Sequence, residues 1–410
     1  MFLVKGGEDL RNDERIELLF DLMNSVVASS SSSTSSTSSS SSSSSSLISG
    51  GNGRSLRART YTVIPMTSEV GILEWVGNTI PIKAVVSQEM ALDNQFCAKN
   101  RDFAGSKELS QSDAFSIRYD WVKGNDIPSY HKMFRDASEK NAVAVCKQVD
   151  DLLPDDFLRR RILKTSVGPE SFITLRTEFA KTLAVSSLFG YILGLGDRHL
   201  ENLLMDTQTG AILQIDFGCC FGMGQSTLGV PEFIPFRLSP QLRAVLRPLN
   251  GTGLLRHYMV QTMSCLRQEE GLQILTNALQ VFINDPLVDW VGGLGEPDAE
   301  PKRRVESCLR KLRGVDPATI MIEDLSLNPH VRREKSLSQL SSMVRNACHL
   351  NVKDMEISDS TACRPDMGGM DETEEEGEIL SVENQVDSVI ALAVDPNIVI
   401  RQWVGLAAWI

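Results

Sequence analysis

Three polar residues near the middle of the chain have the types and the spacing that phosphoryl transfer requires. Asp197 and Asn202 stand five positions apart, and Asp216 follows in an Asp-Phe-Gly sequence. Transfer needs a carboxylate that accepts the proton of the attacking hydroxyl, and oxygen ligands that hold a divalent cation against the phosphates. We therefore predict that Asp197 is the catalytic carboxylate and that Asn202 and Asp216 bind Mg²⁺, with Mn²⁺ as an alternative metal.

A β-hairpin is predicted between these residues and would bring them together. Residues 203–205 and 211–215 are apolar, and the Asp-Thr-Gln-Thr-Gly between them has turn composition. Antiparallel pairing about that turn places the start of one strand beside the end of the other. Asn202 and Asp216 would then lie close enough to share a cation. Each motif alone is also compatible with a surface polar cluster or an ordinary turn, so the prediction depends on their joint spacing.

A long helix that begins at Pro169 is predicted before this segment. Its apolar residues recur at three- and four-residue steps: Phe172, Leu175, Phe179 and Leu183. We expect this helix to pack beneath the loop that carries Asp197, which matters because catalysis of this kind depends on orientation. Further helical patterns cover residues 254–267, 272–282 and 382–393.

The first residues of the chain predict a second part of the site. Residues 2–5 read as a strand that ends in Lys5, and residues 8–24 read as an amphipathic helix. A strand lysine followed by a helix that carries acids is how kinases position nucleotide phosphates. Residues 2–20, FLVKGGEDLRNDERIELLF, resemble such a kinase segment, and this resemblance implies that Lys5 is catalytic and binds phosphate, with Glu8 and Asp13 as candidate acidic partners. A solvated lysine at a strand end is the alternative.

Two segments are predicted to be disordered because they cannot bury apolar surface. Every residue from 29 to 46 is Ser or Thr, and residues 353–378 are acidic. The first is expected to be part of a Ser-rich insertion over residues 29–55, between the helix and the next strand. The second is expected to be a linker.

The overall composition excludes several classes of protein. The chain has 410 residues, of which 42% are hydrophobic and 23% charged, as expected of a globular protein with more than one domain. The formal net charge of −12 argues against this chain gripping DNA or an anionic membrane by itself. The basic runs at 159–161 and 302–304 are local exceptions, and such runs are also typical of solvated helix faces. The eight cysteines form no CxxC pair, and no signal peptide is visible, which favours reduced thiols in the cytosol or nucleus.

The order of letters around Asp197 indicates a family. In ordinary protein kinases His-Arg precedes the catalytic aspartate, whereas here His199 follows it. The sequence Gly-x-Gly-Asp-Arg-His-x-x-Asn resembles the phosphatidylinositol 3-kinase superfamily, which contains lipid kinases and very large Ser/Thr protein kinases. The resemblance implies that Asp197 acts on the incoming hydroxyl and that His199 stabilises the transferring phosphoryl group. A buried structural histidine is the alternative for His199.

Residues 60–76, TYTVIPMTSEVGILEWV, resemble the hinge that links the two lobes in that family. There, backbone groups bind adenine and a tryptophan stacks on it, which implies that Trp75 has this role, since an aromatic face suits a purine. A tryptophan buried in the core is the alternative. The resemblance also implies that Tyr61, Glu74 and Val76 contact the nucleotide. Leu204 and Ile215 are implied to form an apolar floor beneath it.

The segment after Asp-Phe-Gly favours a protein substrate over a lipid. Residues 219–236 contain no Lys or Arg. A lipid kinase must draw an anionic headgroup into its site, which basic residues in this segment accomplish. Residues 230–240, VPEFIPFRLSP, also resemble the protein-kinase branch of the family. Position 219, usually polar in the family, is a cysteine here.

The resemblance covers residues 2–76, 154–290 and 382–410 and implies an α+β, two-lobed kinase fold. The chain begins at the lysine strand, without the strands and loop that normally cover the ATP phosphates, and is expected to be a fragment of a longer protein. The expected organisation is a partial amino-terminal lobe and hinge (1–76), a mainly helical large lobe (77–295) with a catalytic loop (194–202) and an activation segment (216–237), a helical extension and acidic linker (296–380), and a FATC domain (381–410).

The carboxy-terminal segment departs from the family pattern at one point. Where the FATC domain usually has a second aromatic residue after Gly405, this chain has Leu406 followed by two alanines. The family pattern therefore does not predict how this tail docks.

By this resemblance, the activity is ATP- and Mg²⁺-dependent phosphorylation of Ser or Thr, commonly followed by Gln, in the nucleus. The match is nearest to the branch that acts in double-strand-break repair by non-homologous end joining. It implies the Ku heterodimer and DNA ends as partners, through regions absent from this chain, and no membrane. Three alternatives stay open: another member that signals DNA damage or senses nutrients, a phosphoinositide lipid kinase, and an inactive kinase-like scaffold.

Overall fold

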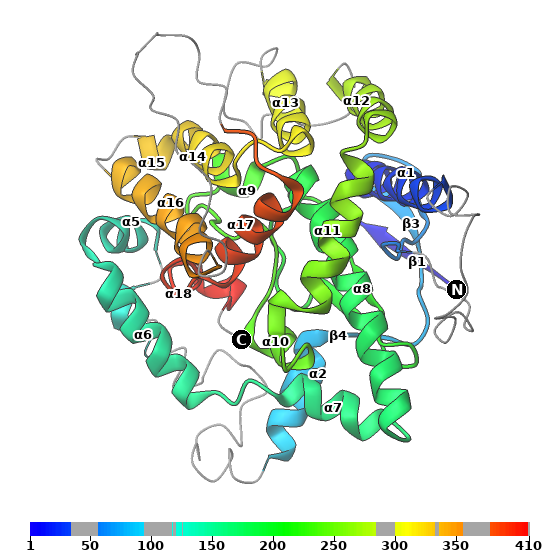
Figure 1. The fold of residues 1–410 in the computed structure, drawn as a ribbon, viewed down its shortest axis with the longest axis horizontal. Helices are drawn as coiled ribbons and strands as arrows, with labels where there is room; N and C mark the ends of the chain where they lie inside the picture. The colour runs from blue at the N-terminus through cyan, green and yellow to red at the C-terminus, as the bar shows by residue number, and fades with distance from the viewer. Residues whose placement is uncertain are drawn as a thin grey trace, which may run out of the picture.

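The computed structural model describes residues 1–33, 56–93, 117, 120–124, 126–283, 300–332, 336–355 and 378–408. A small part built of strands and one long helix lies against a larger helical part (Figure 1). No helix among the described residues is long and apolar enough to cross a membrane. The described elements are β1 (Phe2–Gly6), α1 (Arg11–Ser33), β2 (Val63–Pro65), β3 (Val70–Glu74), β4 (Thr79–Pro81), α2 (Ile82–Leu92), α5 (Ile127–Asp136), α6 (Glu139–Leu152), α7 (Phe157–Thr165), α8 (Pro169–Leu193), β5 (Leu203–Asp206), β6 (Ile212–Gln214), α9 (Met223–Ser226), α10 (Pro240–Val245), η3 (Asn250–Thr252), α11 (Leu254–Leu266), α12 (Glu269–Ile283), α13 (Glu300–Arg313), α14 (Pro317–Leu327), α15 (Pro329–Arg332), α16 (Ser336–Met355), α17 (Val382–Val394), α18 (Pro396–Val399) and η5 (Val404–Leu406).

The small part consists of an antiparallel sheet in the order β1-β3-β2 and the helix α1. One face of α1 is buried, including Ile16, Phe20 and Val27. The sequence predicts this helix over residues 8–24, but it begins at Arg11 and continues to Ser33. It continues because Val26 and Val27 are still buried and because serine hydroxyls bond back to the preceding turn.

The prediction of disorder from residue 29 is therefore wrong for the first serines of the tract, which are helical. Residues 34–55 of the predicted insertion lie outside the described residues. A similar difference occurs near the carboxy terminus, where α16 continues to Met355, three residues into the predicted acidic linker. Residues 356–377 also lie outside the described part of the chain.

The predicted hairpin is confirmed as β5 and β6, which pair antiparallel with Leu203 opposite Gln214. The short strand β4, for which the sequence carries no clear signal, pairs with β5 and completes a second sheet in the order β4-β5-β6. Asn202 directly precedes β5 and Asp216 lies two residues after the end of β6, so this sheet carries the predicted metal-binding residues at its strand ends.

The predicted helix beneath the hairpin is confirmed as α8. It begins with Pro169 at a position where the missing N–H is harmless, and it is buried through its second half. The Thr182 hydroxyl accepts the Ile212 N–H at 2.8 Å, which ties the helix to β6. The helix ends at Gly194, which has φ +61°. A Cβ on Gly194 would lie 2.5 Å from the Gly222 nitrogen, so the residue must be glycine for the activation segment to pass.

The carboxy-terminal helices pack around the end of α8 rather than forming a separate body. The helix predicted over residues 382–393 is confirmed as α17, which contacts α11 and α16 (Figure 1). The helices predicted over residues 254–267 and 272–282 are confirmed as α11 and α12. Described residues of α13, α14, α16, α17 and α18 therefore contribute directly to the core of the large part.

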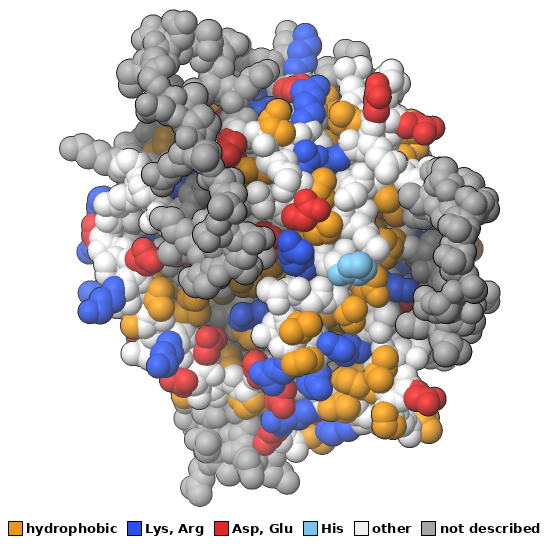
Figure 2. Space-filling model, in the orientation of Figure 1, with side chains coloured by type: hydrophobic (Ala, Val, Ile, Leu, Met, Phe, Trp, Pro, Cys, Tyr) orange, Lys and Arg blue, Asp and Glu red, His pale blue; other side chains and the backbone are white. Residues whose placement is uncertain are grey.

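The basic run at residues 159–161 is used for internal contacts. Arg160 pairs with Asp93 and Asp156, and Arg161 lies 3.6 Å from Glu89. Arg159 donates to the last carbonyls of α10, a position that suits a cation. Figure 2 likewise shows acidic and basic side chains interspersed over this face of the molecule. This run is thus engaged by groups of the chain itself.

Candidate active site

The loop between α8 and β5 holds Asp197 in an unusual backbone conformation. Asp197 has φ +54°, a left-handed conformation that few side chains adopt, and its side chain is 45% exposed. The Asn202 side-chain nitrogen donates to the Asp197 carbonyl at 3.0 Å. The Asn202 side-chain oxygen is consequently the group left for a cation. The structure thus joins two of the predicted site residues through a direct hydrogen bond.

The third predicted residue, Asp216, follows directly after β6 and lies beside this loop. The Ile215 N–H donates to the Asn202 carbonyl at 3.1 Å, so the predicted juxtaposition of strand ends is confirmed. Asp216 is exposed and also has a left-handed backbone, with φ +63°. Two left-handed aspartates on facing loops indicate a backbone held by its surroundings.

Arg198 is the residue that holds the two loops together, and the sequence reasoning missed it. It is 5% exposed and donates to three backbone carbonyls. These are Gly196 at 2.8 Å, Ile215 at 2.9 Å and Asp216. Its guanidinium also lies 5.4 Å from the Phe217 ring centroid. The middle residue of Asp-Arg-His therefore positions the loops instead of facing the cleft.

Phe217 of Asp-Phe-Gly is fully buried and links the two parts of the molecule. Its ring packs against Phe20 of α1 at 5.7 Å and stacks with Tyr61 at 6.5 Å. The Tyr61 hydroxyl is hydrogen-bonded to the Asp216 backbone, and burial raises the pKa of this phenol. Tyr61 thus supports Asp216 from behind, whereas the family resemblance assigns it to nucleotide contact.

Lys5 forms an ion pair with Glu8, one of its two predicted acidic partners. Burial lowers the pKa of Lys5, but the Glu8 hydrogen bond and the charges of Glu8, Asp216 and Asp13 outweigh it and raise the pKa. The lysine is therefore charged and lies within the field of the Asp216 carboxylate. This position fits a phosphate ligand at the edge of the metal-binding residues.

Asp13 takes a different part from the one predicted. It is 6% exposed, and its carboxylate accepts the Phe217 N–H at 3.1 Å. Burial raises the pKa of Asp13, and the Asp216 charge adds to this effect. Asp13 thus fixes the backbone of Asp-Phe-Gly and influences Lys5 only through its charge.

His199 is half-buried beside Asp197, and its geometry defines which ring nitrogen carries the proton. The Glu201 N–H donates to His199 Nδ1 at 3.2 Å, so the neutral ring is protonated at Nε2. Nε2 lies 4.0 Å from an Asp197 carboxylate oxygen. A donor and a proton acceptor therefore stand side by side at the mouth of the loop.

The hinge residues lie along the connection from β3 to β4. Trp75 is 54% exposed, so the alternative of a core tryptophan is wrong. The Glu74 carboxylate is used by Thr62, whose N–H and hydroxyl both donate to it at 2.9 Å. The Val76 carbonyl accepts the Thr79 hydroxyl at 2.8 Å. An exposed indole beside the junction of the two parts remains compatible with purine stacking.

Leu204 and Ile215 have the partial exposure expected of an apolar floor. Leu204 is half-buried, whereas its neighbours on β5 are buried, because alternate side chains of a strand point to opposite faces. Ile215 is likewise half-buried at the end of β6. Both therefore face away from α8.

Buried side chains from many elements hold the activation segment. Asn328 is completely buried, and its amide donates to the Gln225 and Leu228 carbonyls, both at 2.9 Å. The other anchors of this kind are Arg304 to the Phe221 carbonyl (3.0 Å), Gln402 from the Phe233 N–H (3.2 Å), and Arg237 to the Leu406 and Ala407 carbonyls (both 2.6 Å). The sequence gives no periodic or motif signal for these contacts.

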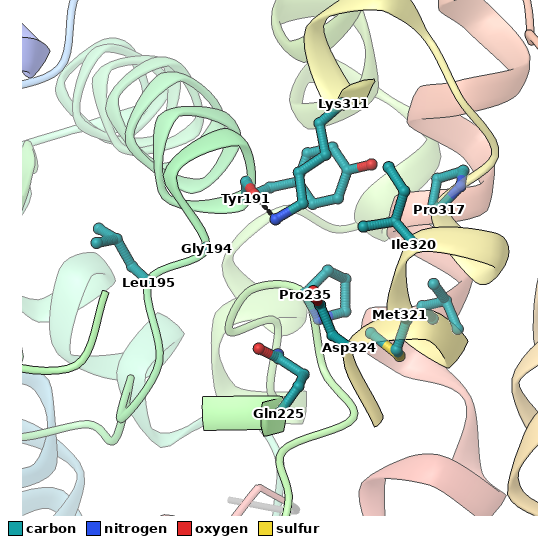
Figure 3. A pocket seen from close by; sticks show the side chains of 11 residues that line it. Tyr191, Gly194, Leu195, Gln225, Pro235, Lys311, Pro317, Ile320, Met321 and Asp324 are labelled. Carbon is teal, nitrogen blue, oxygen red and sulfur yellow. Dashed lines mark hydrogen bonds between the residues drawn. The ribbon is translucent and has the colours of Figure 1, made fainter. Parts of the chain in front are cut away.

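Figure 3 shows the junction of α8, the activation segment and α14 from close by. Lys311 points to the end of α8 and donates to the Tyr191 carbonyl at 3.0 Å. The cavity there has a volume of about 20 Å³, room for roughly one water molecule. It is therefore a packing feature and no substrate site.

The donor set fits a divalent cation of the magnesium type. Asn202 and Asp216 offer oxygen ligands only, because the Asn202 nitrogen is engaged by Asp197. Magnesium is commonly held by one or two such side chains together with water and substrate phosphates. The described residues include no cluster of three His, Cys, Asp or Glu that would hold a metal without such help.

Comparison with known proteins agrees with this fold. The sequence pattern of the phosphatidylinositol 3- and 4-kinase family matches residues 1–292. The chain is similar to the DNA-dependent protein kinase catalytic subunits of Dictyostelium discoideum (32% identity over 428 residues, 98% of this chain, 9% of the relative) and Mus musculus (30% over 428 residues, 100% and 9%). It is also similar to serine/threonine-protein kinase MEC1 of Candida albicans (30% over 296 residues, 71% and 11%). Among solved structures, the FAT and kinase domain of CtTel1 matches 83% of this chain, with 21% of that structure covered, at a TM-score of 0.57 and 24% identity.

The fold is thus the α+β, two-lobed fold of this class of kinases, as predicted. The chain belongs to the phosphatidylinositol 3- and 4-kinase family, within the branch of related protein kinases that includes the DNA-dependent protein kinase catalytic subunits. It spans 9% of the length of those subunits.

Proposed function

We propose that this chain is the catalytic part of an ATP-dependent serine/threonine protein kinase. The observation that carries the proposal is the convergence of Asp197, Asn202 and Asp216, joined by backbone and side-chain hydrogen bonds at one edge of the β5–β6 hairpin. Lys5 stands in the field of the same carboxylate. Each catalytic group that the family requires is thus present and supported, which favours an enzyme over a scaffold.

In this mechanism the residues of the chain orient the reactants and move one proton. The Asp197 carboxylate accepts the proton of the substrate hydroxyl, and His199 Nε2–H donates to an oxygen of the transferring phosphoryl group. Lys5 binds phosphate, and Trp75 stacks on adenine above Leu204 and Ile215. Asn202 and Asp216 would hold Mg²⁺, whose charge would offset that of the phosphates.

We further propose a peptide hydroxyl as the acceptor, with Gln after the Ser or Thr. The absence of Lys and Arg from residues 219–236 supports a neutral acceptor over an anionic lipid headgroup. The relatives described above are named as protein kinases. We propose a nuclear role in double-strand-break repair by end joining, with Ku and DNA ends as partners through other regions of a longer protein, and a FATC domain at residues 381–410. These finer assignments are supported by similarity alone.

A transfer assay with radiolabelled ATP tests the proposal. The purified full-length protein, with Mg²⁺, is offered a Ser-Gln peptide, the matched Ser-Ala peptide and phosphatidylinositol vesicles. We expect more label on the Ser-Gln peptide than on the Ser-Ala peptide or the vesicles. The Asp216→Asn variant should label none of the three acceptors. Label on the vesicles alone would indicate a lipid kinase, and no label on any acceptor would favour the scaffold.

A further inference from the structure

Glu232 lies behind the catalytic loop, outside the cleft, and is almost completely buried. Its carboxylate oxygen Oε1 accepts the backbone N–H of Asp197 at 2.9 Å. The contact is thus made to the backbone of Asp197 itself, the residue with the left-handed conformation. A strained conformation of this kind persists only where the surroundings fix it.

Two glycines from separate segments form the seat of the Glu232 carboxylate. A Cβ on Gly196 would lie 2.9 Å from the second oxygen, Oε2, and a Cβ on Gly224 would lie 2.8 Å from it. The backbone of Glu232 also bonds to this seat, because its N–H donates to the Gly224 carbonyl at 3.0 Å. The carboxylate is therefore held between the catalytic loop and the activation segment, with no room for a larger group.

Ionisable groups of both signs surround Glu232. Asp197 and Arg198 face it from the catalytic loop, the Cys219 thiol from the start of the activation segment, and Arg237 from its end. Burial, with a smaller contribution from the Asp197 charge, raises the pKa of Glu232 to about 7 against the lowering effects of the Asp197 N–H and the two arginines. The carboxyl group thus changes its charge in the range in which an enzyme works, and the ionised form is the stronger acceptor.

On the basis of the proposed kinase function, we propose that Glu232 is the positioning residue of Asp197: its carboxylate accepts the Asp197 N–H and holds the catalytic loop in the conformation that presents the Asp197 side chain. Glu232 is no catalytic residue, because it is buried behind the loop and does not touch the reacting groups.

The test compares Glu232→Gln with Glu232→Ala in the full-length protein. Glutamine keeps an oxygen that accepts the Asp197 N–H, whereas alanine removes it. Loss of a hydrogen bond to a charged group corresponds to roughly a 10- to 100-fold effect. We expect Glu232→Ala to lower kcat by about that factor with KM for ATP unchanged, and Glu232→Gln to restore most of it. Protonated Glu232 is a neutral acceptor like glutamine, so wild-type kcat should fall below about pH 7 only to the level of Glu232→Gln, and Glu232→Gln should lack this step.

Hydrogen–deuterium exchange over residues 194–202 provides a readout that needs no activity. Glu232→Ala should accelerate exchange of this segment, whereas Glu232→Gln and the exposed, remote Glu306→Gln should leave it slow. An active wild type in which Glu232→Ala changes neither exchange nor kcat would refute the inference. An effect on KM for ATP with kcat unchanged would also refute it. An inactive wild type with normal exchange would instead contradict the proposed function.

Discussion

Replacement of Asn328 by aspartate is the most direct test of how the activation segment is held. The two side chains have the same shape, and the oxygen that caps α15 by accepting the His330 N–H at 2.9 Å is retained. The amide that donates to the Gln225 and Leu228 carbonyls is lost. An ionised aspartate then places an acceptor oxygen against two carbonyl oxygens at a completely buried position, and a protonated one could donate to only one of them.

The size of the effect follows from these contacts. Each lost hydrogen bond costs about 1 kcal/mol, and facing acceptors in a buried site add at least about 1 kcal/mol more, which gives a total of about 3 kcal/mol. The equilibrium for local opening of the activation segment should therefore rise about 100-fold.

Hydrogen–deuterium exchange of residues 223–232 measures this equilibrium, and peptide kcat/KM measures its consequence. The control is Asn141→Asp, which adds the same charge at an exposed position in the first turn of α6. The exchange rates of Asn328→Asp and of the control are compared. If they agree within about threefold, or roughly 0.7 kcal/mol, the two carbonyl contacts do not hold the activation segment.

Three further substitutions test other parts of the structure. Burial raises the pKa of Glu17 to about 9, above its usual value near 4.5, so unfolding releases a proton between these values and stability falls as the pH rises through that window. Glu17→Gln should therefore gain thermal stability relative to wild type between pH 5 and pH 9 in calorimetry; a constant difference would contradict a buried neutral carboxyl. Arg237→Lys should lose one of the donors to the Leu406 and Ala407 carbonyls, at about 1–3 kcal/mol, and accelerate exchange over residues 396–408, and unchanged exchange would count against the anchor. Lys5→Met should weaken ATP binding at least about tenfold in a fluorescent-nucleotide titration, since a charge contact to phosphate is lost; equal affinity would place Lys5 outside the nucleotide site.

The parts that the sequence predicts well are those with a local signal. The hairpin and α8 follow from turn composition and from apolar periodicity, and their positions are confirmed within one or two residues. Asp197, Asn202 and Asp216 meet because their separation is set by that same hairpin. Local patterns of this kind survive folding because the elements that carry them are short and continuous.

The parts that the sequence does not reveal depend on contacts between distant residues. Asn328 lies more than ninety positions from the carbonyls it binds, and nothing in its own neighbourhood marks it. Arg198 stands inside a recognised motif, but its burial is visible only once β6 closes over it. The sequence predicts too early an end for α1 for a related reason. A serine tract is typical of solvent-exposed chain, but the buried valines before it extend the helix.

The anchoring of the activation segment bears on what counts as an intact enzyme in this family. The family pattern ends at residue 292, whereas Arg304, Asn328 and Gln402, which bind the segment, all lie beyond it. A recombinant piece that ends at that boundary would keep every catalytic side chain and lose three of the groups that fix their surroundings. A homologue can likewise keep its Asp-Arg-His and Asp-Phe-Gly motifs and still lack the side chains that anchor its activation segment. A survey based on those motifs alone would count such a homologue as active. Loss of activity during evolution can therefore begin in segments that carry no catalytic residue.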